Sequence, residues 1–443
     1  MFKYLPHTPE DIEAMLKTIG VKDIDTLYED VPEALKGVDL NIPSSMSELE
    51  LTNHFKTLAD NNRQLKSFMG MGAYDHYTPS VIRHLIERQE FLTAYTPYQP
   101  EVSQGTLQYI FEYQSMICEL TGMDVSNASM YDGATATAEA MYMAVNVRKK
   151  RRHILISDTV NPVIVDVLRT YAYNQDIELE MIESKEGLSD TDAIKDAMRH
   201  DTAAVITQTP NRYGIIEDYM DLGDACSDNK TLFIINQDPS TLSHLKTPRD
   251  QGADIAVGEA QSLGVPLSFG GPYIGYFATT TKLMRKMPGR ICGVTKDVDG
   301  KRAFVLTLQA REQHIRREKA NSNICSNQSL MALFVTIYLS IMGKKGLYEA
   351  QNTSKNHAHY LHDMLLKLPH FIDPFEKPFF KEFTLKTDID VNHMNRLLSE
   401  QGYLGPFNQG AFEVQKEGYI TFSVTEKRTK EEMDHFIDIL GAL

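Results

Sequence analysis

The stretch ADIAVGEAQSLGVPLSFGGP, residues 253–272, joins an apolar, strand-like segment to a turn rich in glycine and proline. Glycine and proline let a backbone turn tightly and approach a neighbour closely. The turn at residues 258–272 therefore has the form of an active-site loop at the end of a strand. Its only charged residue is Glu259, and it contains no lysine, histidine or cysteine.

Apolar segments rich in valine and isoleucine recur before and after this turn, separated by segments of helical character. They lie at residues 153–158, 177–182, 203–208, 232–238, 253–258 and 273–279. Buried strands without clean polar alternation, separated by helices, are typical of a mostly parallel sheet that is covered on both faces. The sequence therefore predicts an α/β fold.

The sequence also predicts how the chain divides into an arm and two domains. Residues 1–70 are expected to form an N-terminal helical arm, whose first helix begins at the N-cap Thr8 and ends at Gly20. Residues 71–330 are expected to form the large α/β domain. Residues 331–443, which open with a long apolar helix, are expected to form a small α+β domain.

Composition and charge exclude several classes of partner. The net charge of −15 argues against nucleic acid, because phosphate binding requires a basic face. The longest apolar run, residues 330–342, is shorter than the roughly 18 residues of a membrane span. The N-terminal residues lack the pattern of a secretion or transit signal, so we expect a cytoplasmic protein. The 4 cysteines are scattered, which fits free thiols in a reducing compartment.

The segment HAHYLH places His357, His359 and His362 close together, a spacing that invites comparison with metal sites. No cysteine or acidic residue stands beside them at ligand spacing, and the flanking sequence is typical of an exposed helix. We expect no bound metal.

Two positions could bind a cofactor at the carboxyl edge of such a sheet. In DGATATAEA, Gly133, Ala134 and Thr135 could bind a phosphate at a helix N-terminus, although close packing of small residues explains the pattern equally well. Asp238, at the end of LFIINQD, could pair with a ring nitrogen. A simple turn or N-cap role is the favoured interpretation of Asp238 from the residues alone.

The loop AYTPYQPEVSQG, residues 94–105, is stiffened by proline and carries hydrogen-bonding side chains. Tyr95, Thr96, Tyr98 and Gln99 could shape a ligand pocket, or the loop could simply pack its tyrosines on the surface. A second polar segment, residues 306–328, interleaves cations with polar residues. It could bind anionic groups or form a solvated helix with internal ion pairs.

Taken together, the loop at 94–105, the motif YDGATATAEA, the turn at 258–272, MPGRICG and the segment at 306–328 resemble a known family. The large domain resembles fold-type I pyridoxal-phosphate (PLP) enzymes. More narrowly, nearly the whole chain is similar to the glycine-decarboxylating P-protein of the glycine cleavage system. The similarity is to its N-terminal half, which is a separate chain in many bacteria.

The resemblance implies that the turn at residues 258–272 lacks the catalytic lysine of the family. In the partner chain of this family, the matching loop carries His-Lys-Thr before a glycine run that ends in Gly-Pro, and its lysine holds PLP as an imine. Counting back from Pro272, these places hold Ala260, Gln261 and Ser262. Glutamine cannot form an imine, so no catalytic lysine and no covalent PLP are expected in this chain.

The same resemblance matches Gly133, Ala134 and Thr135 to the phosphate place of the fold, and Asp238 to the ring-nitrogen place. With Gln261 in place of the lysine, we expect these positions to be vestigial. The residues expected to face the cofactor of the partner are the loop side chains Tyr95, Thr96, Tyr98 and Gln99.

The resemblance also implies a two-chain enzyme. The partner, glycine dehydrogenase (decarboxylating) subunit 2, would carry PLP, and the two chains would form an α2β2 assembly. Glycine would lose CO₂, and its aminomethyl group would pass to the lipoyl group of H-protein. Two alternatives stay open. One is a self-sufficient PLP enzyme that uses Lys246 or Lys282, and the other is a catalytically inactive scaffold or regulatory homologue.

Overall fold

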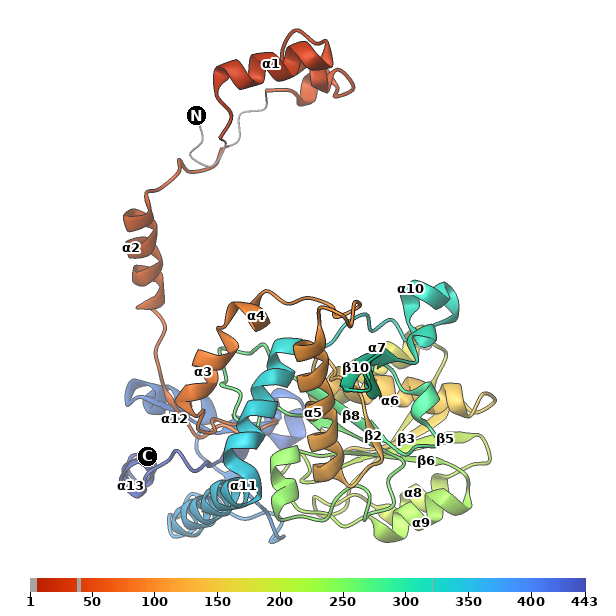
Figure 1. Cartoon of the computed structure of the whole chain (residues 1–443). Coiled ribbons are helices and arrows are strands. Elements are labelled where there is room, and N and C mark those ends of the chain that lie inside the picture. Colours follow the sequence, from red (N-terminus) through yellow and green to blue (C-terminus); the bar gives the residue numbers. More distant parts are fainter. Residues whose placement is uncertain (1–5, 38–40, 321) are drawn as a thin grey trace. The chain divides into compact units, whose positions relative to one another are not determined.

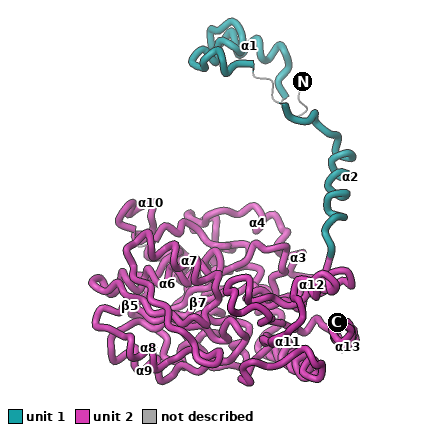
Figure 2. Tube along the Cα trace, turned by 180° about the vertical axis from the view of Figure 1, so that it is seen from behind, with its two compact units in different colours: residues 1–63 teal, residues 64–443 magenta. Residues whose placement is uncertain are grey.

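The computed structural model describes residues 6–37, 41–320 and 322–443. Contacts divide the chain into two compact units, Met1–Arg63 and Gln64–Leu443, which Figure 2 colours separately. We describe each unit by itself.

Unit 1 contains helices α1 (Pro9–Ile19) and α2 (Glu48–Ala59) and the short 3₁₀ helices η1 (Asp25–Tyr28) and η2 (Glu33–Leu35). Thr8 caps α1 and Gly20 ends it with a left-handed backbone at φ 85°, as predicted. No residue of α1 or α2 is buried. Unit 1 is therefore helical and has apolar side chains that remain exposed.

Unit 2 is built on a seven-stranded sheet with the order β2-β8-β7-β6-β5-β3-β4. Its strands are β2 (Val125–Ser126), β3 (His153–Ser157), β4 (Glu178–Ile182), β5 (Thr202–Gln208), β6 (Leu232–Asn236), β7 (Ile255–Glu259) and β8 (Gly275–Thr279). Strands β4, β3, β5, β6 and β7 run parallel, whereas β8 is antiparallel to β7, and β2 to β8. The six predicted strands and the mostly parallel sheet are confirmed.

Alternate residues of these strands supply two separate cores, because successive side chains point to opposite faces. Ile154, Ile206 and Ile234 pack with α6 (Gly133–Val147) and α7 (Pro162–Asn174). The other face packs against α5 (Gln104–Thr121), α8 (Thr191–Ala197), α9 (Met220–Asp228) and the first half of α11 (Ser329–Leu365). Figure 1 shows α5 and α11 beside one another on this face.

Helix α11 has a kink at Gly343, where φ is 57°, and its second half leads into a third core. There a four-stranded antiparallel sheet, in the order β11-β12-β15-β14, packs with α12 (Val391–Glu400) and α13 (Lys430–Gly441). The strands are β11 (Phe371–Ile372), β12 (Glu382–Thr387), β14 (Phe407–Asn408) and β15 (Tyr419–Ser423). This α+β part follows the large sheet in the chain, and the predicted boundary at residue 330 stays a prediction.

The segment just after unit 1 differs from the expectation that the arm extends to residue 70. Strand β1 (Lys66–Ser67) pairs in parallel with β13 (Tyr403–Leu404), and Phe68 is fully buried in the third core. A short strand with one apolar side chain gives no sequence signal for so distant a pairing. Residues 64–70 therefore belong to unit 2.

Helix α11 is also the one helix in the described ranges that is long and apolar enough to cross a membrane by length and composition. Its residues Ala332, Val335 and Tyr338 are fully buried in unit 2. We therefore interpret α11 as a core helix.

The remaining elements of unit 2 are short. They are α3 (Ser80–Ile86), α4 (Gln89–Leu92), the antiparallel hairpin of β9 (Ile291–Lys296) and β10 (Arg302–Thr307), α10 (Gln313–Arg316), and the 3₁₀ helices η3 (Pro239–Ser243), η4 (Met284–Lys286), η5 (Gln309–Arg311), η6 (Arg317–Lys319), η7 (Gln409–Ala411) and η8 (Val414–Lys416).

Candidate functional site

A cavity of about 380 Å³ lies at the carboxyl ends of β6 and β7, beside the N-terminus of α6. This edge is where parallel sheets bind ligands. The cavity is lined by Met71, Gly72, Ala73, Tyr74, Asp132, Gly133, Ala134, Thr135, Asn161, Val163, Ile164, Val167, Gln208, Pro210, Asn236, Asp238, Thr241, Glu259, Tyr273, Phe380, Lys381 and Glu382. Four of the predicted site residues are among them, and Gln261 is not.

Gln261 is fully buried and its side-chain amide is completely used by backbone groups. Its Oε1 accepts a hydrogen bond from Tyr74 N at 2.8 Å, and its Nε2 donates to Tyr74 O at 2.9 Å and to Val265 O at 2.6 Å. The amide therefore holds the segment at residues 71–74 against the turn that follows β7. At the place where the resemblance expects the imine-forming lysine to be replaced, this chain has a structural hydrogen-bonding group.

Asp238 is also bonded within the chain. Its Oδ1 accepts from the backbone N and the Oγ of Ser240, at 3.0 and 2.8 Å, and from the hydroxyl of Ser262. Its Oδ2 lies 2.7 Å from Nζ of Lys381, whose side chain is 3% exposed. Burial acts to raise the pKa of Asp238, but the Lys381 ammonium and the Ser262 hydroxyl hold that pKa below its usual value.

Lys381 is held by a series of buried polar contacts that the sequence did not predict. Its Nζ lies 2.8 Å from Nε2 of His76 and 4.1 Å from the centre of the Tyr74 ring. Nδ1 of His76 in turn lies 2.6 Å from Glu426 Oε2. Burial and the Lys381 charge lower the pKa of His76, so the neutral imidazole accepts from Lys381 and donates to Glu426. Lys381 thus supplies the cation that Asp238 requires.

The N-terminus of α6, the predicted phosphate place, already has a carboxyl group from the chain itself. Oε2 of Glu259 accepts from Gly133 N at 2.9 Å, and its Oε1 accepts from the backbone N–H groups of Gln261 and Ile274, both at 3.0 Å. A side chain at Gly133 would place Cβ only 2.7 Å from Glu259 N, so glycine is required there. Burial raises the pKa of Glu259 to about 8, and the three N–H donors oppose that rise.

The other residues of this helix start are satisfied locally. Asp132 is the N-cap of α6, and its Oδ1 accepts from Thr135 N at 2.7 Å. The Thr135 hydroxyl donates back to Asp132, and Ala134 lines the cavity. The predicted phosphate place is therefore a capped helix end with Glu259 across it.

These three positions do not fit PLP. The expected imine position has a glutamine whose amide is bonded to the backbone, the expected ring-nitrogen partner Asp238 is paired with Lys381, and the expected phosphate place has the carboxyl group of Glu259 bonded to Gly133 N. Neither Lys246, which pairs with Asp218 at 2.5 Å, nor Lys282 lines the cavity. Lys381 does line it, but as the buried partner of Asp238.

The loop at residues 94–105 lies outside this cavity, since none of its four predicted residues lines it. Arg290, from MPGRICG, holds the loop: its Nη2 donates to Tyr98 OH at 3.1 Å and its Nη1 to Thr96 Oγ1 at 3.4 Å. The guanidinium lies 5.2 Å from the centre of the Tyr98 ring. Tyr95 is 84% exposed and Gln99 is exposed. The loop thus has a fixed base and an exposed aromatic tip.

The segment at 306–328 lies next to the loop through His314, whose ring meets that of Tyr98 edge-on at 5.7 Å. Glu312 Oε2 lies 3.7 Å from Nε of Arg290 and 3.4 Å from Nδ1 of His314. Glu312 therefore pairs with Arg290, which lies outside the segment, and the two alternatives for residues 306–328 stay predictions.

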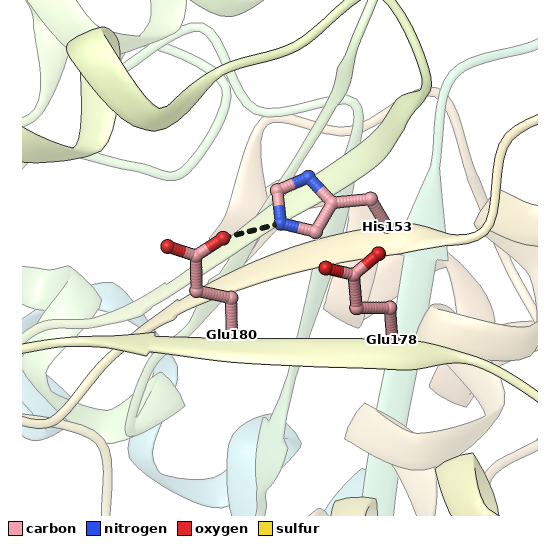
Figure 3. A group of neighbouring side chains, drawn as sticks. All are labelled: His153, Glu178 and Glu180. Carbon is pink, nitrogen blue, oxygen red and sulfur yellow. Dashed lines mark hydrogen bonds and ion pairs between the residues drawn. The ribbon is translucent and has the colours of Figure 1, made fainter.

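The histidines of HAHYLH bond separately: His357 to Thr425 O, His359 to Phe379 O and His362 to Asp373. The group in the described residues that could reach a single ion is instead His153, Glu178 and Glu180 (Figure 3). There, Glu180 bonds to His153 at 2.7 Å, while Arg199 binds both oxygens of Glu178, at 2.7 and 3.1 Å. Arg199 already balances the charge of Glu178, so the group is explained without a metal.

Comparison with known proteins decides the family of the chain. A family model described as "Glycine cleavage system P-protein" matches residues 2–440. The chain belongs to this family. It is 49% identical, over 98% of both chains, to "Probable glycine dehydrogenase (decarboxylating) subunit 1" of Moorella thermoacetica. It is 47% identical to the protein of the same name from Geobacillus thermodenitrificans, over 100% of this chain and 99% of that one.

Solved structures agree with the P-protein family. The inhibitor-bound crystal structure of "glycine decarboxylase (P-protein) of the glycine cleavage system" matches the whole chain with a TM-score of 0.93 and 40% identity. Glutamate decarboxylase of Lactobacillus brevis, at a TM-score of 0.71 and 12% identity, and a sphingosine-1-phosphate lyase of Burkholderia pseudomallei, at 0.67 and 14%, share the fold alone. The predicted fold-type I architecture is confirmed.

Proposed function

We propose that this P-protein chain is the subunit of a heteromeric glycine decarboxylase that lacks the imine-forming lysine. Together with its partner it would release CO₂ from glycine and pass the aminomethyl group to the lipoyl group of H-protein. The observation that carries the proposal is Gln261, buried and fully hydrogen-bonded where a PLP-binding chain requires a free lysine amine.

The partner in this proposal is glycine dehydrogenase (decarboxylating) subunit 2, which binds PLP, in an α2β2 assembly. Support comes from the relatives, which are named as subunit 1 of a decarboxylating glycine dehydrogenase. Further support comes from Lys381, which pairs with Asp238 at the expected ring-nitrogen place, and from Glu259, which bonds to Gly133 at the expected phosphate place. We place the enzyme in the cytoplasm, because the four cysteines are free thiols, as a reducing compartment requires.

The contribution of this chain to catalysis is proposed to come from the loop at residues 94–105, with Tyr95, Thr96, Tyr98 and Gln99 forming one wall of the partner's site. Tyr95 is 84% exposed, and its hydroxyl has no hydrogen-bond partner within the described ranges. Arg290 fixes Tyr98 and Thr96, so the loop can keep its shape while its tip contacts another chain.

Purification of the chain with and without its partner tests the proposal. Alone, with added PLP, the chain should give no imine absorbance and no glycine-dependent exchange of CO₂, while the two chains together should give both. Borohydride reduction of the complex should attach the pyridoxyl group to a peptide of the partner. Exchange by the chain alone, or a pyridoxyl group on its Lys246, Lys282 or Lys381, would overturn the proposal.

The second candidate function is an inactive scaffold. It is favoured because Gln261, Asp238 and Glu259, at the expected cofactor places, are bonded to groups of the same chain. A scaffold would keep the partner folded and would tolerate any change at the tip of the loop. Glycine exchange by complexes with substituted Tyr95 or Tyr98 therefore separates the two candidates.

A further inference from the structure

The cavity at the edge of the sheet keeps a volume of about 380 Å³ although its cofactor places are filled. This volume is within the range of small-molecule pockets. Its lining contains four carboxyl groups, those of Asp132, Asp238, Glu259 and Glu382, and a single cation, Lys381. The lining is thus acidic in composition, unlike that of a pocket for a phosphorylated cofactor.

The single cation does not balance the other carboxyl groups. Nζ of Lys381 lies 2.7 Å from Asp238 and also contacts Ser240 Oγ at 2.9 Å. Glu382 instead accepts from neutral donors, the Tyr74 hydroxyl at 2.9 Å and the backbone N–H of Met71. Glu259 likewise has only backbone donors. Two buried carboxyl groups at the cavity therefore have no cation of their own.

The titration behaviour of these groups agrees with this geometry. Burial raises the pKa of Glu259 to about 8 and that of Glu382 to about 7. Lys381 offsets only part of the rise at Glu382, because Asp238 is its direct partner. Burial thus favours the protonated form of both groups near neutral pH, and a positive charge that enters the cavity would favour their ionised forms instead.

Asn236, at the end of β6, provides an independent indication of a ligand. It is 6% exposed and lines the cavity. Its Nδ2 donates to Thr137 Oγ1 at 2.9 Å, whereas its Oδ1 has no hydrogen-bond partner among the described residues. This oxygen, at the lining of the cavity, therefore offers an acceptor to a ligand that carries an N–H group.

Part of the wall of the cavity is apolar. Val163, Ile164 and Val167 of α7 lie on it together with Phe380. Such a wall binds a hydrocarbon body, while the acceptors at Asn236, Glu259 and Glu382 bind a donor head.

We propose that this cavity binds a small organic cation, a primary ammonium group attached to a compact apolar body. The ammonium would donate to Asn236 Oδ1 and lie near the carboxyl groups of Glu382 and Glu259, with the apolar body against α7. This goes beyond the proposed part of the chain in glycine decarboxylation, and it does not depend on it, since the site is formed within one chain.

The test is a calorimetric titration of the full chain, without its partner, at neutral pH with three probes of one shape: benzylammonium, benzyl alcohol and benzoate. Benzylammonium should bind with one site per chain and at least about tenfold more tightly than the alcohol, the effect expected of a charge-assisted hydrogen bond. Benzoate should not bind. Equal binding of all three, preference for benzoate, or no saturable binding of benzylammonium would overturn the proposal.

Variants locate the site. Glu382→Gln, which keeps an acceptor but removes the charge, and Asn236→Leu should each weaken benzylammonium binding about tenfold. Asn236→Asp should bind it at least as tightly as the wild type, an effect that loss of folding cannot mimic. Asp192→Asn, at an exposed carboxyl on α8 outside the cavity, is the matched control and should change nothing. Wild-type affinity in both Glu382→Gln and Asn236→Leu would place the ligand elsewhere and overturn the assignment.

Discussion

The buried cavity and the exposed loop at residues 94–105 differ in whether their polar groups are bonded within the chain. Asp238 and Glu259 at the cavity, and Gln261 beside them, are each bonded to groups of the same chain. In the loop, Arg290 fixes the base, but Tyr95 is 84% exposed and its hydroxyl has no partner in the described part of the chain. The difference indicates that the first region contributes mainly to stability, and that the second is available to another chain.

The largest expected effect on stability comes from Lys381→Met. It leaves Asp238 buried without its cation, which costs about 3–5 kcal/mol in the free energy of unfolding. The double variant Lys381→Met, Asp238→Leu should recover most of that loss, because replacing a whole buried ion pair is often close to neutral. Denaturant unfolding of the wild type, both single variants and the double variant measures this coupling. A loss below about 1 kcal/mol in Lys381→Met would contradict a stabilising role for the cavity.

Gln261→Lys probes whether the cavity is still a cofactor site. The change removes the amide that bonds to Tyr74 and Val265 and buries an ammonium without a partner. We expect a loss of about 2–4 kcal/mol in unfolding free energy. With added PLP and borohydride, no pyridoxyl-lysine should form at residue 261.

Gln261→Met is the matched control, since it removes the hydrogen bonds without adding a charge and should cost less than Gln261→Lys. Efficient labelling of residue 261 by PLP would show that the ring-nitrogen and phosphate places still accept the cofactor. The cavity could then not be described as a region that contributes mainly to stability.

Glu259→Gln tests the filled phosphate place through its pH dependence. The pKa of Glu259 is raised in the folded chain to about 8, so the folded state binds a proton that the unfolded state has already lost above its lower pKa. The wild type should therefore lose stability relative to Glu259→Gln as pH rises from about 4.5 to about 8, by at most about 1.4 kcal/mol per pH unit. Above that range the difference should be constant.

Urea unfolding of the wild type and Glu259→Gln at a series of pH values measures this difference. If the wild type instead gains stability relative to Glu259→Gln as pH rises, the three backbone donors dominate over burial and Glu259 is a permanent anion. A difference that does not vary would mean that its pKa is unchanged by folding.

Much of the fold was predictable because buried parallel strands are local and apolar. Residues 153–158 and 203–208 are recognisable as strands without knowledge of their neighbours, and β3 and β5 confirm them. By contrast, β1 is two residues long and pairs with β13 across most of the chain. Its pairing depends on tertiary packing alone, so the sequence placed residues 64–70 in the wrong part of the molecule.

Prediction of the site from the sequence was limited in the same way. The expectation that Gln261 stands at the place of a lysine came from the resemblance, because the neighbours of Gln261 keep the pattern of an active-site loop. Lys381 and His76 could not be found, because neither stands in a motif and both reach Asp238 only in the folded chain. Glu259 was visible as the only charge in the turn, but its bond to Gly133 at the start of α6 is a product of the fold.

The smallest expected effect on stability, and the sharpest test of the loop, comes from Tyr95→Ala. Because Tyr95 is 84% exposed, its removal should change the unfolding free energy by less than about 0.5 kcal/mol. Glycine exchange by the two-chain complex should nevertheless fall about tenfold, the cost of losing one aromatic contact at a site that must exclude water. Tyr173→Ala is the matched control, because Tyr173 on α7 is 86% exposed and belongs to neither region. Exchange that falls equally in both variants, or in neither, would remove the loop from the partner's site and leave the chain as a scaffold.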